Sequence, residues 1–362
     1  INKGAVAYFK YLNDTAGGVK MADGKTRKIN FVVEDDGFEA ARALTNVTKL
    51  NEEDKVFAVA GGLGTTPNVA MLPYVTSNKV PDVFIQDGTS AFGQIDKYPT
   101  SIIWQPAYSL ESYLFAQYLK DNKPDAKVGI LAVEGASATD YIDGFKKSIE
   151  GTNIQIVSEK THSFSDPTMD PYIDEFNRAG ADTVLYATLP GYVSQGLIKA
   201  KAIGYQPLNL VVNPGNSYEQ GIKNAGDAAN GIITLNFLKD PAAKEWADDP
   251  DIAWYKDLLG KYASDLNPND YFNLQGFAWA QTLVAALEQA QPNRESFMSA
   301  VRNLKDVKIR GLVDGITVNT SSTDAFPIES MVFEKFENGG YTVEGTPVDA
   351  SGKTPLISDA IK

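Results

Sequence analysis

The residues best placed to do chemistry form a run of glycines and hydroxyls after an apolar stretch. Residues 61–67 read Gly-Gly-Leu-Gly-Thr-Thr-Pro, follow the apolar run 55–60 and precede a helical pattern. Free N–H groups at the start of a helix attract an anion, and the hydroxyls of Thr65 and Thr66 add donors. The alternative interpretation is a plain turn between a strand and a helix, capped by a threonine.

A second strand end has the same character. Residues 86–90 read Gln-Asp-Gly-Thr-Ser and contain Gly88, Thr89 and Ser90, with Phe92 close behind. In an open α/β sheet, ligands bind beyond the carboxyl ends of the strands, so two such ends predict one site. Hydroxyls and amides without a lysine or arginine suit a carboxylate better than a polyphosphate.

Three later strand ends are candidates for the other wall of this site. The candidate residues are, strand by strand, Glu134, Ser137 and Ala138, then Tyr192, then Asn213. Tyr192 has a ring that can stack on a ligand and a hydroxyl that can hydrogen-bond to it. The alternative for Tyr192 is a surface or partly buried aromatic with no ligand.

Few residues suggest catalysis or a metal. Glu34, Asp35 and Asp36 could bind a divalent cation, but acids at a strand end usually make turns and caps. The chain has one histidine, His162, and no cysteine, which excludes multi-histidine zinc sites, thiolate sites and a cysteine nucleophile. No serine-hydrolase motif is present. We therefore expect no enzyme, no metal and no cofactor, with a metal at Asp35, Asp36 and Glu134 as the enzymatic alternative.

The composition sets the class of protein. The 362 residues suit two domains of ~150 residues each, and 43% hydrophobic with 22% charged residues is ordinary for a globular chain. With 33 basic and 46 acidic residues the net charge is −13, which repels a phosphate backbone, so we expect no nucleic-acid partner. No apolar run approaches the ~18 residues of a membrane span.

Short apolar runs alternate with helical patterns along the chain. The expected strands are 28–36, 55–60, 81–85, 101–104, 127–133, 153–157, 182–187 and 208–212. The expected helices are 1–12, 40–47, 68–77, 109–120, 142–149, 194–203 and much of 240–300, and a hairpin is expected over 331–343. Strands that are apolar throughout are typical of parallel sheets covered by helices on both faces, so we predict doubly wound sheets.

The order of these segments resembles the solute-binding proteins of branched-chain amino acid ABC importers. The similarity runs over nearly the whole chain and is strongest to the subgroup described as extracellular ligand-binding receptors, which take amino acids, aromatic acids and other small organic acids. The segments that carry it are 13–18, 33–36, 56–65, 80–84, 140–145, 166–168, 180–182, 203–204, 227–231 and 327–328.

The resemblance implies an α/β fold with two Rossmann-like lobes, each with a parallel doubly wound sheet, joined by a three-crossing hinge, the type I periplasmic binding protein fold. The crossings are expected near 105–108, 236–239 and 312–317. Lobe one would then comprise 1–106 and 238–314, and lobe two 107–237 and 315–362, with the ligand cleft between them.

The resemblance also implies roles for residues at the strand ends. Thr65 or Thr66, together with Gly88 and Ser90, would hold the ligand carboxylate in lobe one, and Tyr192 would close over the ligand from lobe two. Two positions depart from the family pattern. Ser137-Ala138 stands where many relatives have Tyr-Gly, and the loop 213–216 lacks the acid that pairs with an amino group, for which Glu134 or Asp87 could substitute.

Members of this family begin with a β-strand and a Ser/Gly loop ahead of the helix that starts here at Ile1. We expect such a segment to precede Ile1, and a lipid anchor could be attached to it. The implied function is extracytoplasmic capture of a small carboxylate-bearing ligand by hinge closure and delivery to the membrane permease of an ABC importer, by a protein that is a monomer. The alternative is a ligand-sensing domain of a receptor or regulator with the same fold.

Overall fold

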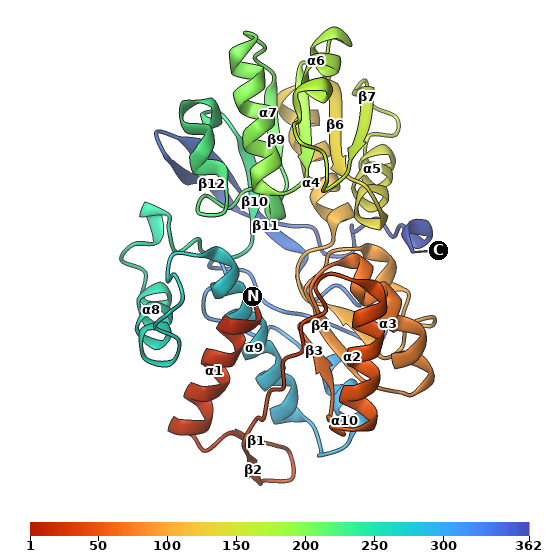
Figure 1. Ribbon diagram of the computed structural model, residues 1–362, viewed down its shortest axis with the longest axis vertical. Helices are drawn as coiled ribbons and strands as arrows, with labels where there is room; N and C mark the ends of the chain where they lie inside the picture. Colours follow the sequence, from red (N-terminus) through yellow and green to blue (C-terminus); the bar gives the residue numbers. More distant parts are fainter. Residues whose placement is uncertain (362) are drawn as a thin grey trace.

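Two main sheets, one in each lobe, organise the structure (Figure 1), and β1 (Val19–Lys20) and β2 (Thr26–Arg27) form a small antiparallel sheet beside them. The computed structural model describes residues 1–361. The lobe-one sheet contains β3 (Val59–Ala60), β4 (Asp82–Ile85) and β5 (Ser101–Ile103), all parallel. The lobe-two sheet has seven strands in the order β12-β11-β10-β9-β8-β6-β7. The prediction of an α/β fold with largely parallel sheets is confirmed.

The lobe-two sheet is parallel in one part and antiparallel in the other. Its parallel strands are β6 (Lys127–Val133), β7 (Gln155–His162), β8 (Thr183–Ala187), β9 (Leu208–Val211) and β10 (Ile233–Asn236). The hairpin of β11 (Ser330–Glu337) and β12 (Gly340–Asp349) adds antiparallel to β10. Asn338 and Gly339 at its turn both have positive φ, as a tight hairpin turn requires.

Helices cover the sheets of both lobes (Figure 1). Lobe one has α1 (Asn2–Thr15), α2 (Ala40–Glu52), α3 (Thr65–Ser77), α8 (Pro250–Tyr262), α9 (Tyr271–Gln289) and α10 (Arg294–Val301). Lobe two has α4 (Tyr108–Asn122), α5 (Ala136–Ser148), α6 (Asp170–Arg178) and α7 (Pro190–Ala202). Short elements complete the chain: β1 (Val19–Lys20), β2 (Thr26–Arg27), η1 (Ser90–Gly93), η2 (Asn213–Gly215), η3 (Ile222–Ala229), η4 (Lys244–Trp246) and η5 (Ser358–Ala360).

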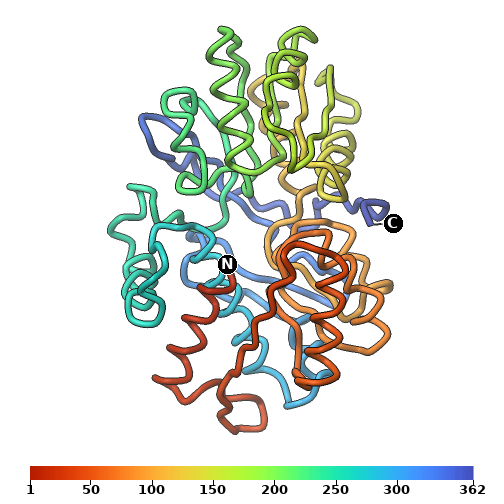
Figure 2. Tube along the Cα trace, viewed as in Figure 1, coloured from red at the N-terminus to blue at the C-terminus, as the bar shows by residue number. Residues whose placement is uncertain are grey.

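The chain passes between the lobes more than once (Figure 2). It goes from β5 into α4, from β10 towards α8, and back to β11. Before this last passage, Val318 forms an isolated β-bridge with Val307. The amide of Thr320 donates to the carbonyl of Leu304, so residues 318–320 still pack with lobe one. At the end of the chain, η5 contacts both η1 and α5 and therefore lies against both lobes.

Two strand predictions in lobe one are wrong. Residues 28–36 form no strand, and the predicted strand 55–60 is reduced to β3. An apolar run becomes a strand only when a neighbour accepts its backbone hydrogen bonds. The backbone of Ile29 bonds instead to the side chain of Asn13, and residues 30–35 make no backbone hydrogen bond within the described chain.

Candidate ligand-binding site

The N-termini of α3 and α5 meet between the lobes. A cavity of about 330 Å³ lies there, and its lining residues are Ala40, Thr65, Thr66, Val69, Ala70, Ala136, Ala360 and Ile361. Thr65 and Thr66 come from lobe one and Ala136 from lobe two, so the cavity is an interlobe cleft. None of these lining residues carries a charged side chain.

Both helices begin at this cleft without a side-chain cap. α3 starts after Gly64 and α5 after Gly135, and neither start has a side chain that caps the free N–H groups. Gly64 has φ 86° and Gly135 has φ 119°, which a residue with a side chain rarely adopts. Uncapped amides and two helix dipoles favour an anion between them.

Asp87 lies directly behind Thr65. The Thr65 hydroxyl donates to Asp87 Oδ2 at 2.5 Å, and the Thr89 amide donates to Oδ1 at 2.7 Å. Burial raises the pKa of this carboxyl, while the bonds from Thr65 and Thr89 oppose the rise. Because the Thr65 proton points to Asp87, this hydroxyl offers the cleft its lone pairs and suits a hydrogen-bond donor on a ligand.

Ser90 is fully buried and bonds across the lobes. Its amide and hydroxyl donate to Asp140 Oδ1 at 3.0 and 2.6 Å, and the Ser109 amide donates to Oδ2 at 3.0 Å. The Ile357 amide donates to the Ser90 hydroxyl at 2.9 Å. Burial raises the pKa of Asp140 to about 8. With its polar atoms engaged in this way, Ser90 holds η1 against α5 instead of facing the cleft.

Gly88 and Phe92 contribute to packing around the site and do not bind at it. A side chain at Gly88 would lie 2.4 Å from the ring of Tyr108, so the glycine allows this ring to pack on the backbone. Phe92 is fully buried in the main hydrophobic core. Both residues therefore position the strand end that carries Asp87 and Thr89.

Asn213 belongs to a buried polar network near the hinge. Its amide donates to Glu111 at 2.6 Å, and its side chain donates to Asn236 at 2.6 Å and to the Tyr271 hydroxyl at 3.0 Å. Tyr271 begins α9 in lobe one, so Asn213 links the lobes. Burial raises the pKa of Glu111 to about 8.

Two aromatic rings meet across the lobes, and one of them, Phe38, packs against Gly64 at the start of α3. The rings of Phe38 from lobe one and Phe164 from lobe two meet edge to face, with centroids 6.1 Å apart. Tyr192 donates from its hydroxyl to the Phe164 carbonyl at 2.9 Å and packs on His162 at 4.4 Å. Tyr192 thus holds the loop that presents Phe164. No motif in the sequence pointed to Phe38, which follows the predicted strand 28–36, or to Phe164, which follows β7.

The remaining predicted residues fall into two groups. Ser137 is half-buried and Ala138 buried in the first turn of α5, beside the cleft residue Ala136. Glu134 is exposed, and its amide donates to the His162 carbonyl at 2.9 Å. His162 itself bonds through its ring to Thr188 at 2.6 Å, deep in lobe two.

The acidic run 34–36 makes turn contacts. Asp35 and Asp36 accept bonds from the amides of Gly37 and Phe38 at 2.9 and 2.7 Å, and Glu34 pairs with Lys49. Within residues 1–361 no group of three or more histidine, aspartate or glutamate side chains is arranged to hold a metal ion.

Comparison with known proteins decides the family. A family model described as periplasmic binding protein matches residues 1–340. The chain belongs to the periplasmic binding protein family. Its fold is that of the type I members, as the resemblance implied. No curated protein matches this periplasmic binding protein in sequence.

Three solved structures illustrate the similarity. The branched-chain amino acid ABC transporter protein from Thermus thermophilus with bound valine has a TM-score of 0.85 at 18% identity, over 96% of this chain and 91% of that one. A fatty acid ABC transporter substrate-binding protein from Thermomonospora curvata has a TM-score of 0.81 at 21% identity, over 98% and 90%. An ABC transporter solute-binding protein from Rhodopseudomonas palustris BisB5 with 3,4-dihydroxybenzoic acid has a TM-score of 0.77 at 20% identity, over 99% and 94%.

The family to which the chain belongs is extracytoplasmic. In the described part of this periplasmic binding protein, no helix is both long and apolar enough to cross a bilayer.

Proposed function

We propose that this protein captures a small carboxylate-bearing ligand, an amino acid or an aromatic or aliphatic organic acid, and delivers it to the permease of an ABC importer. The observation that carries the proposal is the meeting of two uncapped helix N-termini, α3 and α5, across the interlobe cleft. An anion held between them satisfies amides from both lobes at once, so binding favours the closed arrangement.

The rest of the cleft suits a small carbon skeleton. A volume of about 330 Å³ is at the small end of ligand pockets, and Val69 and Ala70 supply an apolar wall. We propose that Phe38 and Phe164, whose rings meet edge to face between the lobes, close the mouth of the cleft. The hydroxyl of Thr65 accepts a hydrogen bond from an amino or hydroxyl group on the ligand.

The bound compounds of similar proteins support a carboxylate. Valine and 3,4-dihydroxybenzoic acid, bound in two of the similar structures, both carry a carboxyl group, and so does the fatty acid named for the third. Their chains differ in size and polarity. A shared anion-binding end with a variable apolar end is therefore the arrangement that we propose for this protein.

Transport requires that capture be coupled to a change of shape. We propose that the lobes rotate about their connections and that the closed form docks on the permease, as a rigid-body hinge motion. The protein acts as a binding protein without catalysis, outside the cytoplasmic membrane, and as a monomer.

The proposal is tested at the first amide of α5. Ala136→Pro removes the N–H group of this residue and leaves the helix intact, because proline is tolerated at the first helical position. Losing a bond to a charged group costs about 1.5–3 kcal/mol, so the affinity for the bound acid should fall at least about tenfold.

Ala136→Gly is the matched control, since it keeps the amide and changes the side chain by one methyl group. Calorimetric titration with the acid should give the glycine variant an affinity near that of the wild type, and the proline variant a much lower affinity. Equal affinities of the proline variant and the wild type for the acid would show that α5 does not hold the anion.

A further inference from the structure

One wall of the interlobe cleft comes from a segment far from both helix starts in the sequence. Ala360 and Ile361 line the cavity of about 330 Å³, together with Thr65 of α3 and Ala136 of α5. The side chains of Ala360 and Ile361 are both buried. Ala360 ends η5 and Ile361 follows it, so residues that come after β12 form part of the site.

Hydrogen bonds hold the segment 356–361 to both lobes. In lobe two, Lys147 of α5 donates through Nζ to the carbonyl of Leu356 at 3.0 Å. In lobe one, the hydroxyl of Ser90 accepts a bond of 2.9 Å from the amide of Ile357. Because the backbone is anchored on each lobe, the segment stays where the lobes meet, and Figure 1 shows its short turn at that level, beside the mark for the C-terminus.

The cleft has a polar end and an apolar end. Its polar end is the pair of uncapped helix starts at Thr65 and Ala136. Val69 lies one turn further along α3 than Thr65, and Ala70 is next to it. The side chains of Val69, Ala70 and Ile361 offer only hydrocarbon to the cavity. An acid whose carboxylate lies at the helix starts therefore places its carbon chain among these three side chains.

We propose that Ile361 determines the length of the ligand by bounding the space for its carbon chain, and that the ligand is an acid with a short apolar chain. Ile361 carries the largest side chain of all the residues that line the cleft, so its size limits this space more than that of any other. The inference rests on the proposed function, since it takes the carboxylate to lie at the starts of α3 and α5.

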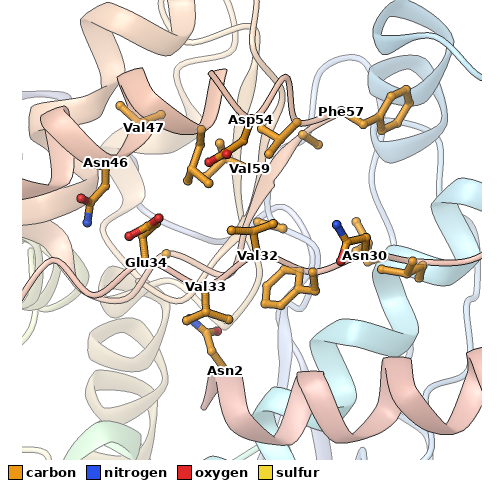
Figure 3. Close-up of a pocket in the computed structure, with 18 of the residues that line it drawn as sticks. Asn2, Asn30, Val32, Val33, Glu34, Asn46, Val47, Asp54, Phe57 and Val59 are labelled. Atoms are coloured by element: carbon orange, nitrogen blue, oxygen red, sulfur yellow. The ribbon is translucent and has the colours of Figure 1, made fainter. Parts of the chain in front are cut away.

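A larger cavity inside lobe one is separate from this site and provides a control position. Its volume is about 890 Å³, and it shares no lining residue with the cleft. Figure 3 shows Val32, Val33 and Val47 among the side chains around it. A substitution of Val33 therefore changes apolar surface in lobe one without changing the wall of the cleft.

The test measures the chain-length preference of Ile361→Ala. The probes are three homologous pairs: butanoate with hexanoate, the 2-amino forms of these two acids, and benzoate with phenylacetate. Titration calorimetry gives, for each pair, the ratio of the affinity for the longer acid to that for the shorter one. One methylene group in an apolar pocket changes binding by about tenfold or more, so this ratio should rise at least about tenfold in the pair that the wild type binds best.

Two controls separate the wall of the cleft from general loosening. Leu356→Ala removes a side chain of the same size from the same segment, at a position that is 42% exposed and lines neither cavity. Val33→Ala acts only in the larger cavity. Both controls should keep the wild-type ratio. Ile361→Val removes a single methylene group and should raise the ratio by less, which keeps the test decisive if the alanine variant does not fold.

A rise of the ratio in the Ile361 variants alone supports the proposal. An unchanged ratio, including equal losses of both affinities from a loosened segment, would overturn it, and so would an equal rise in Leu356→Ala. In either case the binding of acids by the wild type would leave the proposed function standing. A wild type that bound none of the acids would refute the proposed function, and the inference with it.

Discussion

The hydroxyl of Ser90 in lobe one donates a hydrogen bond of 2.6 Å to Asp140 in lobe two. The amide of Ser90 reaches the same oxygen at 3.0 Å, and Asn213 makes a second interlobe bond to Tyr271. These buried bonds fix how the two lobes meet at the cleft. The residues that hold the lobes together are thus distinct from those that line the cleft.

Ser90→Ala should lower the free energy of unfolding by about 2 kcal/mol, because the buried carboxyl of Asp140 loses a hydrogen-bond partner. The measurement is urea unfolding at pH 7. Ser351→Ala is the control, since Ser351 makes a hydrogen bond of the same length to Asp349 on the surface. The control should change stability by less than about 0.5 kcal/mol. Equal losses in both variants would mean that the bond to Asp140 contributes nothing beyond a surface contact.

The stability of the protein should depend on pH through its buried carboxyls. Burial raises the pKa of Glu334 to about 8, as it does for Glu111 and Asp140. The folded state thus keeps protons that the unfolded chain releases near pH 4, so this stability is present at low pH and is lost as pH rises toward about 8. Unfolding free energies measured between pH 5 and 9 should fall.

Glu334→Gln should make this fall shallower by up to ~1.4 kcal/mol per pH unit, the contribution of one proton. Glu337→Gln, an exposed position on the same strand, is the control and should leave the slope unchanged. A slope that Glu334→Gln does not alter would contradict the burial of a protonated carboxyl at this position.

Phe38 and Phe164 should act together on ligand release. Each single change to alanine should speed dissociation of the acid that gives the largest thermal shift, because each opens the mouth of the cleft. Their edge-to-face contact predicts a coupling of about 0.5–1.5 kcal/mol in a double-mutant cycle of dissociation rates. Strictly additive effects would show that the two rings do not meet when the ligand is bound.

Asp87→Asn should change which kind of ligand group forms a hydrogen bond with the Thr65 hydroxyl. The asparagine amide can donate to Thr65, so the threonine proton turns to the cleft, and a negative charge behind it disappears. Binding of a plain carboxylic acid should tighten several-fold, and binding of its 2-amino analogue should weaken. Titration of both acids checks this. Parallel loss of both affinities would contradict the assigned direction of the Thr65 hydrogen bond.

The order of strands and helices follows from hydrophobic periodicity, which is a local property. The apolar runs that became β4, β6, β8 and β9 are read directly from the sequence. Residues 28–36 have the same pattern and still form no strand. A strand also requires partners on its edges, and these depend on which segments lie beside it.

The candidate site was predictable in part for the same reason. Thr65, Thr66 and Ser137 follow strand ends and start helices, so their place at the cleft edge follows from the topology. Ser90 and Asn213 stand at equivalent points but turn to Asp140 and Glu111, which lie 50 and 102 residues away in the sequence. The sequence around Ser90 or Asn213 does not indicate such distant partners.

A thermal-shift screen of the purified protein tests whether the cleft captures a carboxylic acid. The panel pairs each small carboxylic acid with its neutral amide, and includes amino acids, aromatic acids and sugars. If the cleft captures a carboxylic acid, one acid class raises the thermal midpoint while the matched amides do not, since a ligand at 100 times its Kd adds ~2.7 kcal/mol. If an acid already occupies the cleft, denaturing the protein should release it, and mass spectrometry should identify it. A shift with sugars or amides but with no acid, or a protein that neither shifts nor releases an acid, would contradict the capture of a carboxylic acid.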